Sequence, residues 1–214
     1  MARTTGWIGS RGTTLSAAAV ALSLAPAMFG GDTAVRAASE YPTKQSQSGV
    51  TIAIEPYQSE AKVDEAFPKT NPPKYGILPV LLVMENAGDA PLDLKNLVVR
   101  YTPRGEEGID AIPAGELALW NPKGHQPRDR PKYIPSVPGI GNKPKVKKGP
   151  MAKPEVTDSG FEAPVLAPGD SAHGFFYFHV GDVDRALSGA TIYISGVHNM
   201  TTNQDLFYFE LPLD

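Results

Sequence analysis

Short runs of alternating or continuous apolar residues, separated by turn residues, recur along the chain. Residues 50–55 alternate between apolar and polar positions and end at Pro56, which predicts a half-buried strand. Residues 77–84 read ILPVLLVM, a length that suits a strand buried on both faces, although periodicity alone also permits a buried helix. Pro79 lies inside this run and favours an edge strand or a bulge, because proline cannot donate to a ladder.

The remaining pattern is also mostly that of strands. Residues 59–67 predict one or two helical turns. Further strands are predicted over residues 97–101, 116–120, 163–166, 172–180, 191–197 and 206–211, the last two as a hairpin. About eight short strands, none followed by a convincing long helix, favour an all-β antiparallel sandwich or barrel over a parallel α/β sheet.

The aromatic residues near the C-terminus carry the clearest functional signal. Because side chains alternate along a strand, one face receives Phe175, Tyr177 and His179, and the other receives Phe176, Phe178 and Val180. The predicted core contains Phe176, Phe178, Ile192, Ile194, Phe207 and Phe209. The candidate ligand-binding face contains Phe175, Tyr177, His179, Tyr193 and Tyr208. Exposed aromatic rings rimmed by polar groups mark binding surfaces. The alternative is that a loop or the insertion described below covers these rings.

The start of the chain has the three parts of a secretory signal peptide. Arg3 and Arg11 precede the apolar run 15–25, and small residues suited to cleavage follow around Ala27 and Ala37. We therefore expect residues 1–37 to be a signal peptide and the protein to be periplasmic or extracellular, with no integral membrane segment in the mature chain. The alternative is an uncleaved membrane anchor, which the Ser, Thr, Gly and Pro content of residues 12–31 disfavours.

Residues 121–154 differ in composition from the rest of the chain. This segment holds eight prolines, nine lysines and arginines and one acid, a net charge of +8 within a chain of net charge −3. It predicts an extended basic insertion in a single domain that spans residues 38–214. Its basic strap includes Lys143, Lys145, Lys147 and Lys148. It is either a solvated surface loop or an arm that docks on the acidic body, on an acidic partner or on an anionic envelope polymer.

Composition and residue spacing argue against several kinds of catalytic and metal site. The chain has no cysteine, which excludes disulfides, cysteine-ligated zinc and a cysteine nucleophile. The four histidines lack metal-ligand spacing, and Ser171 follows a Pro-Gly-Asp turn instead of the strand-turn-helix elbow of serine hydrolases. We therefore assign no catalytic residue, no metal site and no cofactor.

Two segments carry a family resemblance. Residues 78–101, LPVLLVMENAGDAPLDLKNLVVRY, resemble a strand-to-strand passage of bacterial immunoglobulin-like modules through Asn86, Gly88, Asp89, Pro91 and Leu92. The tail, LAPGDSAHGFFYFHV followed by ATIYISGVHNMTTNQDLFYFELPL, is similar to exported bacterial proteins of unknown function. The resemblance implies an immunoglobulin-like antiparallel β-sandwich that is secreted or periplasmic, and it implies no catalytic residues.

These features favour a non-catalytic binding or structural module of the cell envelope. Its candidate ligands are an envelope polysaccharide and a partner protein. Nucleic acid is not expected, because the net charge is −3 and export removes the protein from most of it. The alternative is a cryptic envelope hydrolase whose catalytic residues no sequence motif reveals.

Overall fold

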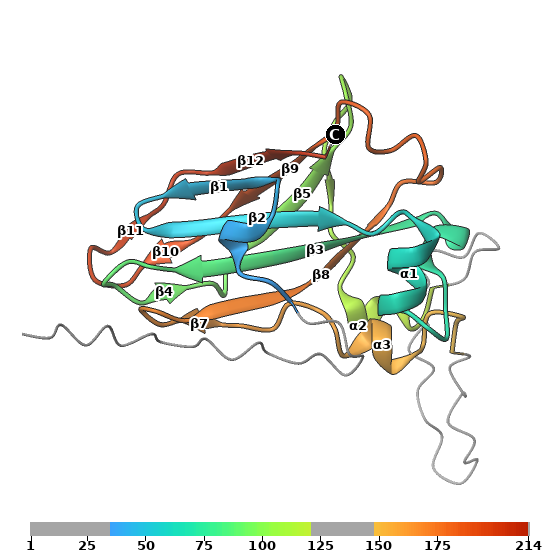
Figure 1. Ribbon diagram of the computed structural model, residues 1–214, viewed down its shortest axis with the longest axis horizontal. Coiled ribbons are helices and arrows are strands. Elements are labelled where there is room, and N and C mark those ends of the chain that lie inside the picture. Colours follow the sequence, from blue (N-terminus) through green and yellow to red (C-terminus); the bar gives the residue numbers. More distant parts are fainter. Residues whose placement is uncertain (1–34, 121–147, 214) are drawn as a thin grey trace, which may run out of the picture.

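The computed structural model describes residues 35–120 and 148–213 (Figure 1). The strands are β1 (Lys44–Gln47), β2 (Val50–Pro56), β3 (Ile77–Asn86), β4 (Leu92–Asp93), β5 (Val98–Thr102), β6 (Ile109–Asp110), β7 (Val165–Leu166), β8 (Ser171–His179), β9 (Thr191–Ser195), β10 (His198–Asn199), β11 (Gln204–Asp205) and β12 (Phe209–Pro212). The helices are η1 (Ala38–Glu40), α1 (Glu60–Ala66), η2 (Pro72–Tyr75), α2 (Ala114–Leu117) and α3 (Pro154–Thr157). None of them is long and apolar enough to cross a membrane.

The strands form an immunoglobulin-like sandwich. One sheet has the order β1-β2-β3-β8, the other has the order β12-β9-β5-β6, and a small sheet of two-residue strands, β11-β10-β4-β7, lies beside them. In immunoglobulin lettering β2, β3 and β8 occupy the places of strands A, B and E, while β5, β9 and β12 occupy those of C, F and G. Every pair of neighbouring strands is antiparallel. The predicted fold class is therefore confirmed.

Strand β3 explains the continuous apolar run. It lies between β2 and β8, and its side chains alternate between two hydrophobic layers. Leu78, Val80, Leu82 and Met84 face the interior of the sandwich, while Ile77, Leu81 and Val83 face outward into a second apolar layer. A strand buried on both faces needs apolar residues at both parities, so the strand interpretation of residues 77–84 is confirmed.

The expectation that Pro79 marks an edge or a bulge is wrong. Pro79 is paired with Tyr177 in the middle of the sheet. Its carbonyl oxygen accepts a hydrogen bond from the Tyr57 N–H at 2.9 Å, just beyond Pro56, where β2 ends. Since the two residues of a hydrogen-bonded antiparallel pair exchange both N–H···O bonds, the missing N–H of Pro79 removes only the reciprocal bond to the Tyr57 carbonyl, one residue beyond the end of β2. The proline therefore costs one hydrogen bond at the end of the β2–β3 ladder.

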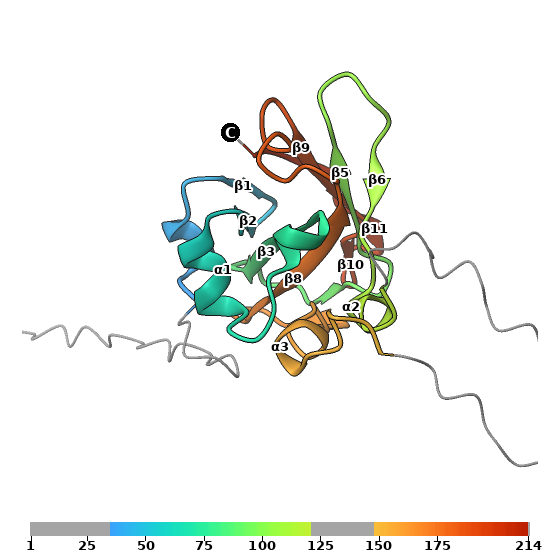
Figure 2. The ribbon, with the colours of Figure 1, turned by 90° about the vertical axis from the view of Figure 1, so that its right-hand side faces the viewer.

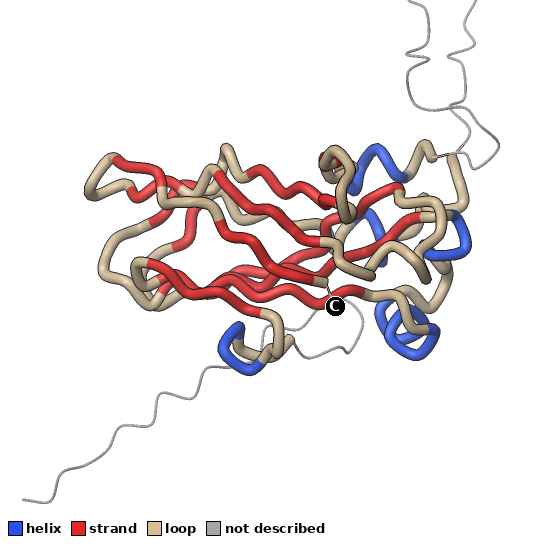
Figure 3. Tube along the Cα trace, turned by 90° about the horizontal axis from the view of Figure 1, so that it is seen from above, coloured by secondary structure: helices blue, strands red, loops and turns tan. Residues whose placement is uncertain are grey.

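The second apolar layer covers the outer face of the β1-β2-β3-β8 sheet, which we call the covered sheet. Its members include Val63 of α1, Leu117 of α2, Val156 of α3 and Met151 before α3. Apart from η1, the helices gather at one end of the molecule (Figures 2 and 3). The helical turn predicted over residues 59–67 is confirmed as α1.

Three sequence expectations about elements need correction. Residues 116–120 form no strand, since α2 begins after Pro113 and turns Leu117 into the second layer. The terminal hairpin is shorter than predicted: β9 pairs with β12 from Phe209 onward, and residues 198–205 form a separate small hairpin of β10 and β11. The surface character expected for residues 121–154 does not hold at Met151, which is fully buried.

The described chain on either side of residues 121–147 meets at a narrow base. The Gly149 N–H donates to the Ala118 carbonyl at 2.8 Å. A Cβ at Gly149 would lie 2.1 Å from the Trp120 carbonyl oxygen, so only glycine allows this approach. We call this contact the neck. Residues 121–147, which include Lys143, Lys145 and Lys147, lie outside the described residues, and Lys148 is exposed beside the neck.

Candidate functional site

The predicted aromatic face does not exist as one surface. Phe175 and Tyr177 lie on the outer side of the covered sheet, whereas Tyr193 and Tyr208 lie on the outer side of the β12-β9-β5-β6 sheet. The two pairs therefore occupy opposite sides of the sandwich. Strand parity assigned each side chain to an outer face correctly, but it did not distinguish the outer faces of the two sheets.

Phe175 and Tyr177 are buried, which contradicts their place in an exposed patch. The Phe175 ring lies 4.9 Å from the Tyr57 ring and 5.0 Å from the Phe67 ring, measured between centroids. The Tyr177 hydroxyl lies 2.9 Å from the Ser159 hydroxyl and donates to the Val156 carbonyl at 3.1 Å. Burial raises the pKa of the Tyr177 phenol well above its ordinary value, because a phenolate there would be desolvated. The alternative, in which loops cover these rings, is the one the structure supports.

His179 lies at the exposed end of β8, with its ring centroid 4.7 Å from that of Trp120. Since Trp120 belongs to the second apolar layer, His179 lies on the covered side of the sandwich. His179 is therefore separated from Tyr193 and Tyr208, although the sequence analysis placed all three on one candidate ligand-binding face.

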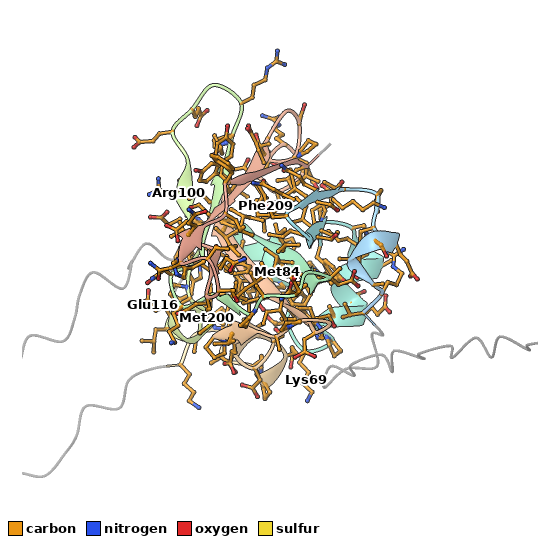
Figure 4. All side chains as sticks on the ribbon, turned by 90° about the vertical axis from the view of Figure 1, so that its left-hand side faces the viewer. Lys69, Met84, Arg100, Glu116, Met200 and Phe209 are labelled. Carbon is orange, nitrogen blue, oxygen red and sulfur yellow. The ribbon has the colours of Figure 1, made fainter. Side chains whose placement is uncertain are left out.

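The outer side of the β12-β9-β5-β6 sheet is not covered by any helix of the described chain, and we call it the open face. Its strands place Asp110, Arg100, Tyr193 and Glu210 opposite one another, in a row that crosses all four strands. The inward residues of the same strands, such as Ile194 and Phe209, are fully buried. Figure 4 shows Phe209 and Met84 in the interior and Arg100 at the periphery. The open face is therefore the outer surface of a well-packed sheet.

Two tyrosines form the aromatic part of the open face. The rings of Tyr193 and Tyr208 stack with centroids 5.1 Å apart, which is the diagonal contact of neighbouring strands. Tyr208 is 52% exposed, and Val98 on β5 is 41% exposed. These side chains give the face a rigid apolar centre, because a stacked tyrosine pair has little rotamer freedom to lose on binding.

Phe207 was predicted to be in the core, but it is 79% exposed. The strand prediction began at Leu206, whereas the Leu206 N–H donates to the Val197 carbonyl and ends the small hairpin. Residues 206–208 connect that hairpin to β12, so strand alternation does not place their side chains. Phe207 therefore adds an exposed aromatic ring beside Tyr208 in the chain.

Arg100 is the ordered cation of the open face. Its Nε lies 2.6 Å from Asp110 Oδ1. The hydrogen bond to Asp110 raises the pKa of the Arg100 guanidinium above its ordinary value, so Arg100 is a permanent cation. Arginine has five N–H donors, and those on its terminal nitrogens make no hydrogen bond to the described residues.

A groove of about 720 Å³ adjoins the open face at β5. Its lining includes Val98 and Arg100 from the face, Ile112, and the stacked rings of Phe161 and Phe176, whose centroids lie 5.7 Å apart. Gly174 permits this arrangement, because a Cβ there would lie 2.4 Å from the Phe161 backbone. Sequence reasoning missed Phe161, since no strand pattern surrounds it and only the packing against Gly174 defines its place.

Outside the open face, one polar pair joins two short strands. His198 Nδ1 lies 2.8 Å from Asp205 Oδ1 across the β10–β11 hairpin, where it ties the half-buried β10 to the exposed β11. Within residues 35–120 and 148–213 no group of three or more His, Cys, Asp or Glu is placed to hold a metal ion. No observation on these residues favours the hydrolase alternative.

No family model matches the chain, and no curated protein matches it in sequence. Among solved structures, the archaellum periplasmic stator protein complex FlaF and FlaG from Sulfolobus acidocaldarius contains a similar chain. The two are 14% identical, the match covers 61% of this chain and 76% of that chain, and the TM-score is 0.28. A score this low carries no conclusion about function. The resemblance to exported bacterial proteins stays an expectation.

Proposed function

We propose that this protein is a non-catalytic binding or structural module of the cell envelope that holds a partner protein on its open face. The observation that carries the proposal is the asymmetry of the sandwich. One outer face lies under a complete second apolar layer, and the other presents Tyr193, Tyr208 and Arg100 with no cover from the described chain. Tyrosine and arginine are the residues most enriched at protein interfaces.

A protein partner fits this face better than a polysaccharide does. The face carries ordered charges of both signs, at Arg100, Asp110 and Glu210, beside its aromatic centre. Charges of both signs complement the mixed charges of another protein surface, whereas a neutral glycan needs aromatic platforms and neutral hydrogen-bonding groups.

The partner-binding proposal is tested by site-specific photocross-linking in the source cells. A photoreactive phenylalanine analogue in place of Tyr208 is expected to form a discrete cross-linked product in the envelope fraction. The same analogue in place of Met200, an exposed residue of the β10–β11 turn, is the matched control and is expected to form none. Equal products from both positions, or none from position 208, would contradict the proposal.

Export is supported by the basic start, the apolar run and the small residues before Ala38. A fusion of residues 1–37 to an alkaline phosphatase that is active only outside the cytoplasm is expected to be active. N-terminal sequencing of the released protein is expected to begin after Ala37. An inactive fusion would contradict the extracytoplasmic location and would leave the binding proposal unaffected.

A further inference from the structure

We infer that the open face takes a second copy of this chain, paired about a two-fold axis that runs along β9 in the plane between the two faces. The inference rests on the proposed binding function and names the partner. Two sheets pack face to face when their strands are nearly aligned, and most homodimers are built on a two-fold axis. The question is whether the open face is complementary to itself under such an axis.

A two-fold axis along β9 has a simple effect on the strand order β12-β9-β5. It lays β9 on the partner's β9, and it lays β5 on the partner's β12. Residues in one cross-strand row stay in that row, because the axis does not shift positions along the strands. Each residue of β5 is thereby set against the β12 residue of its own row.

The central row is complementary in charge. It contains Arg100, Tyr193 and Glu210, so Arg100 of each copy is set against Glu210 of the other and the two Tyr193 rings meet at the axis. Two ion pairs form in each dimer. Glu210 makes no ion pair with the described residues of its own chain, and Arg100 has donors left after its bond to Asp110. Asp110 holds the guanidinium in place, which lowers the entropy lost when the second carboxylate binds.

The flanking rows carry no charged residue. Val98 and Ser195 are paired, and the Tyr208 ring stacks on Tyr193 just before β12 begins, so Val98 of one copy is set near Tyr208 of the other. Both side chains are exposed in the single chain. In the third row Thr102 is set against Pro212, since Thr191 lies between them. An apolar contact of Val98 with Tyr208 thus lies on one side of the charged row, and an uncharged contact of Thr102 with Pro212 lies on the other.

Other ways of joining two copies are less favourable. A two-fold axis across the strands would set β5 on β5 and bring Arg100 against Arg100, which is repulsive. Edge-to-edge addition at β12 is blocked, because the Glu210 N–H already donates to the Gln45 side chain at 2.9 Å and Pro212 has no N–H. Face-to-face pairing along β9 is the arrangement that these residues permit.

Charge reversal tests the inference on the full mature chain by sedimentation equilibrium. Arg100→Glu and Glu210→Arg are each expected to raise the dimer dissociation constant at least tenfold, since each change creates two like-charge contacts per dimer. The double variant restores both pairs with reversed sign. Because Asp110 would repel the carboxylate placed at position 100, the double variant also carries Asp110→Asn and is expected to return to within about threefold of Asp110→Asn alone. Arg185→Glu and Asp184→Arg, in the exposed β8–β9 connection, are the matched controls and are expected to leave the constant unchanged.

A parent protein that stays monomeric, or a double variant as weak as the single ones, would overturn the inference. Thermal melts of all variants show whether they remain folded. The cross-link at position 208 distinguishes failure of the dimer from failure of the proposed function. A product of twice the chain mass supports the second copy. A product with a different protein supports the proposed function and contradicts the dimer.

Discussion

Tyr177 is held both by its ring and by its hydroxyl. The ring packs near Phe67 and Phe175, and the hydroxyl binds Ser159 and the Val156 carbonyl. Removing such a side chain leaves a cavity that the two flanking layers cannot close. Phe207, in contrast, has few contacts to lose, since most of its surface is in solvent.

We therefore expect opposite results from two alanine substitutions. Tyr177→Ala should lower the free energy of unfolding by about 3–5 kcal/mol, the range for emptying a large buried aromatic site. Phe207→Ala should change it by less than about 0.5 kcal/mol, as for other exposed positions. Urea denaturation of both variants measures the difference. Equal losses would mean that Phe207 is packed in solution, contrary to its exposure here.

At this scale the sequence predicted direction but not burial. Alternation placed Phe175 and Tyr177 on one side of β8 and Phe176 and Phe178 on the other, as found. What covers a face comes from segments far away in the chain, such as Phe67 and Met151, and no local pattern shows that they return to it. Burial of an outer strand face is a tertiary property, so parity alone cannot supply it.

Ala38 has a contact that matters if export processing ends at Ala37. Its backbone nitrogen donates to Glu85 Oε1 at 2.8 Å, and Ala38 is fully buried. Cleavage after Ala37 would turn this nitrogen into an ammonium group beside a carboxylate. The carboxylate favours the charged form, so the pKa of the ammonium should rise above its ordinary value of about 7.7–8.0 on folding.

We expect Glu85→Gln to destabilise the chain that begins at Ala38 by roughly 1–3 kcal/mol at about pH 6, where the ammonium is charged in both states. A group whose pKa is raised on folding contributes stability below its ordinary pKa and loses it as the pH rises through the folded value. The deficit should therefore shrink toward about pH 10. A chain with one extra residue before Ala38 is the control. An equal, pH-independent deficit in both chains would mean that Glu85 only caps η1.

At the scale of elements, the neck decides how the insertion is joined to the fold. The Gly149–Ala118 bond and the close approach to Trp120 bring the two ends of residues 121–147 together without using those residues. A segment whose ends already touch can be shortened without moving α2 or α3.

We expect replacement of residues 121–147 by a flexible linker of about four residues to preserve or raise the melting temperature. Shortening a loop from 27 residues to about four lowers its closure entropy by about 1–2 kcal/mol. Calorimetry of the two chains measures the change. A Gly149→Ala variant with the full segment is the contrasting case, expected to be destabilised because the neck cannot close. A lower melting temperature in the shortened chain would show that the basic segment stabilises the body.

The prediction of secondary structure succeeded for long segments with a clear apolar periodicity. It failed for short segments whose conformation depends on contacts with other parts of the chain. The long strands β2, β3, β8 and β9 have apolar patterns that specify them. Residues 116–120 carry a similar short pattern, but Pro113 and the return of the chain at Gly149 favour a helical turn there. A short apolar run can form either a strand or a helix. For residues 116–120 the contact of Gly149 with Ala118 goes with the helical turn, and a local pattern does not show this contact.

At the scale of the whole molecule, the fold class follows from sequence because many short strands leave few other architectures. The strand order does not follow from the sequence, because it depends on which loops cross from one sheet of the sandwich to the other. The candidate site was only partly predictable for the same reason. Parity predicted the outward direction of Tyr193, whereas Arg100, its partner Asp110 and the self-complementary row through Glu210 depend on the register of four strands.

The second apolar layer has a consequence for how such a protein diverges over generations. Its residues come from separate segments, among them α1, α2, α3 and the chain around Met151, so a substitution there must be matched by neighbours that are remote in the gene. The open face requires only that β5, β9 and β12 keep their inward residues. As far as folding alone is concerned, outward residues of the open face can therefore be replaced one at a time, whereas a replacement in the second layer disturbs several distant segments at once.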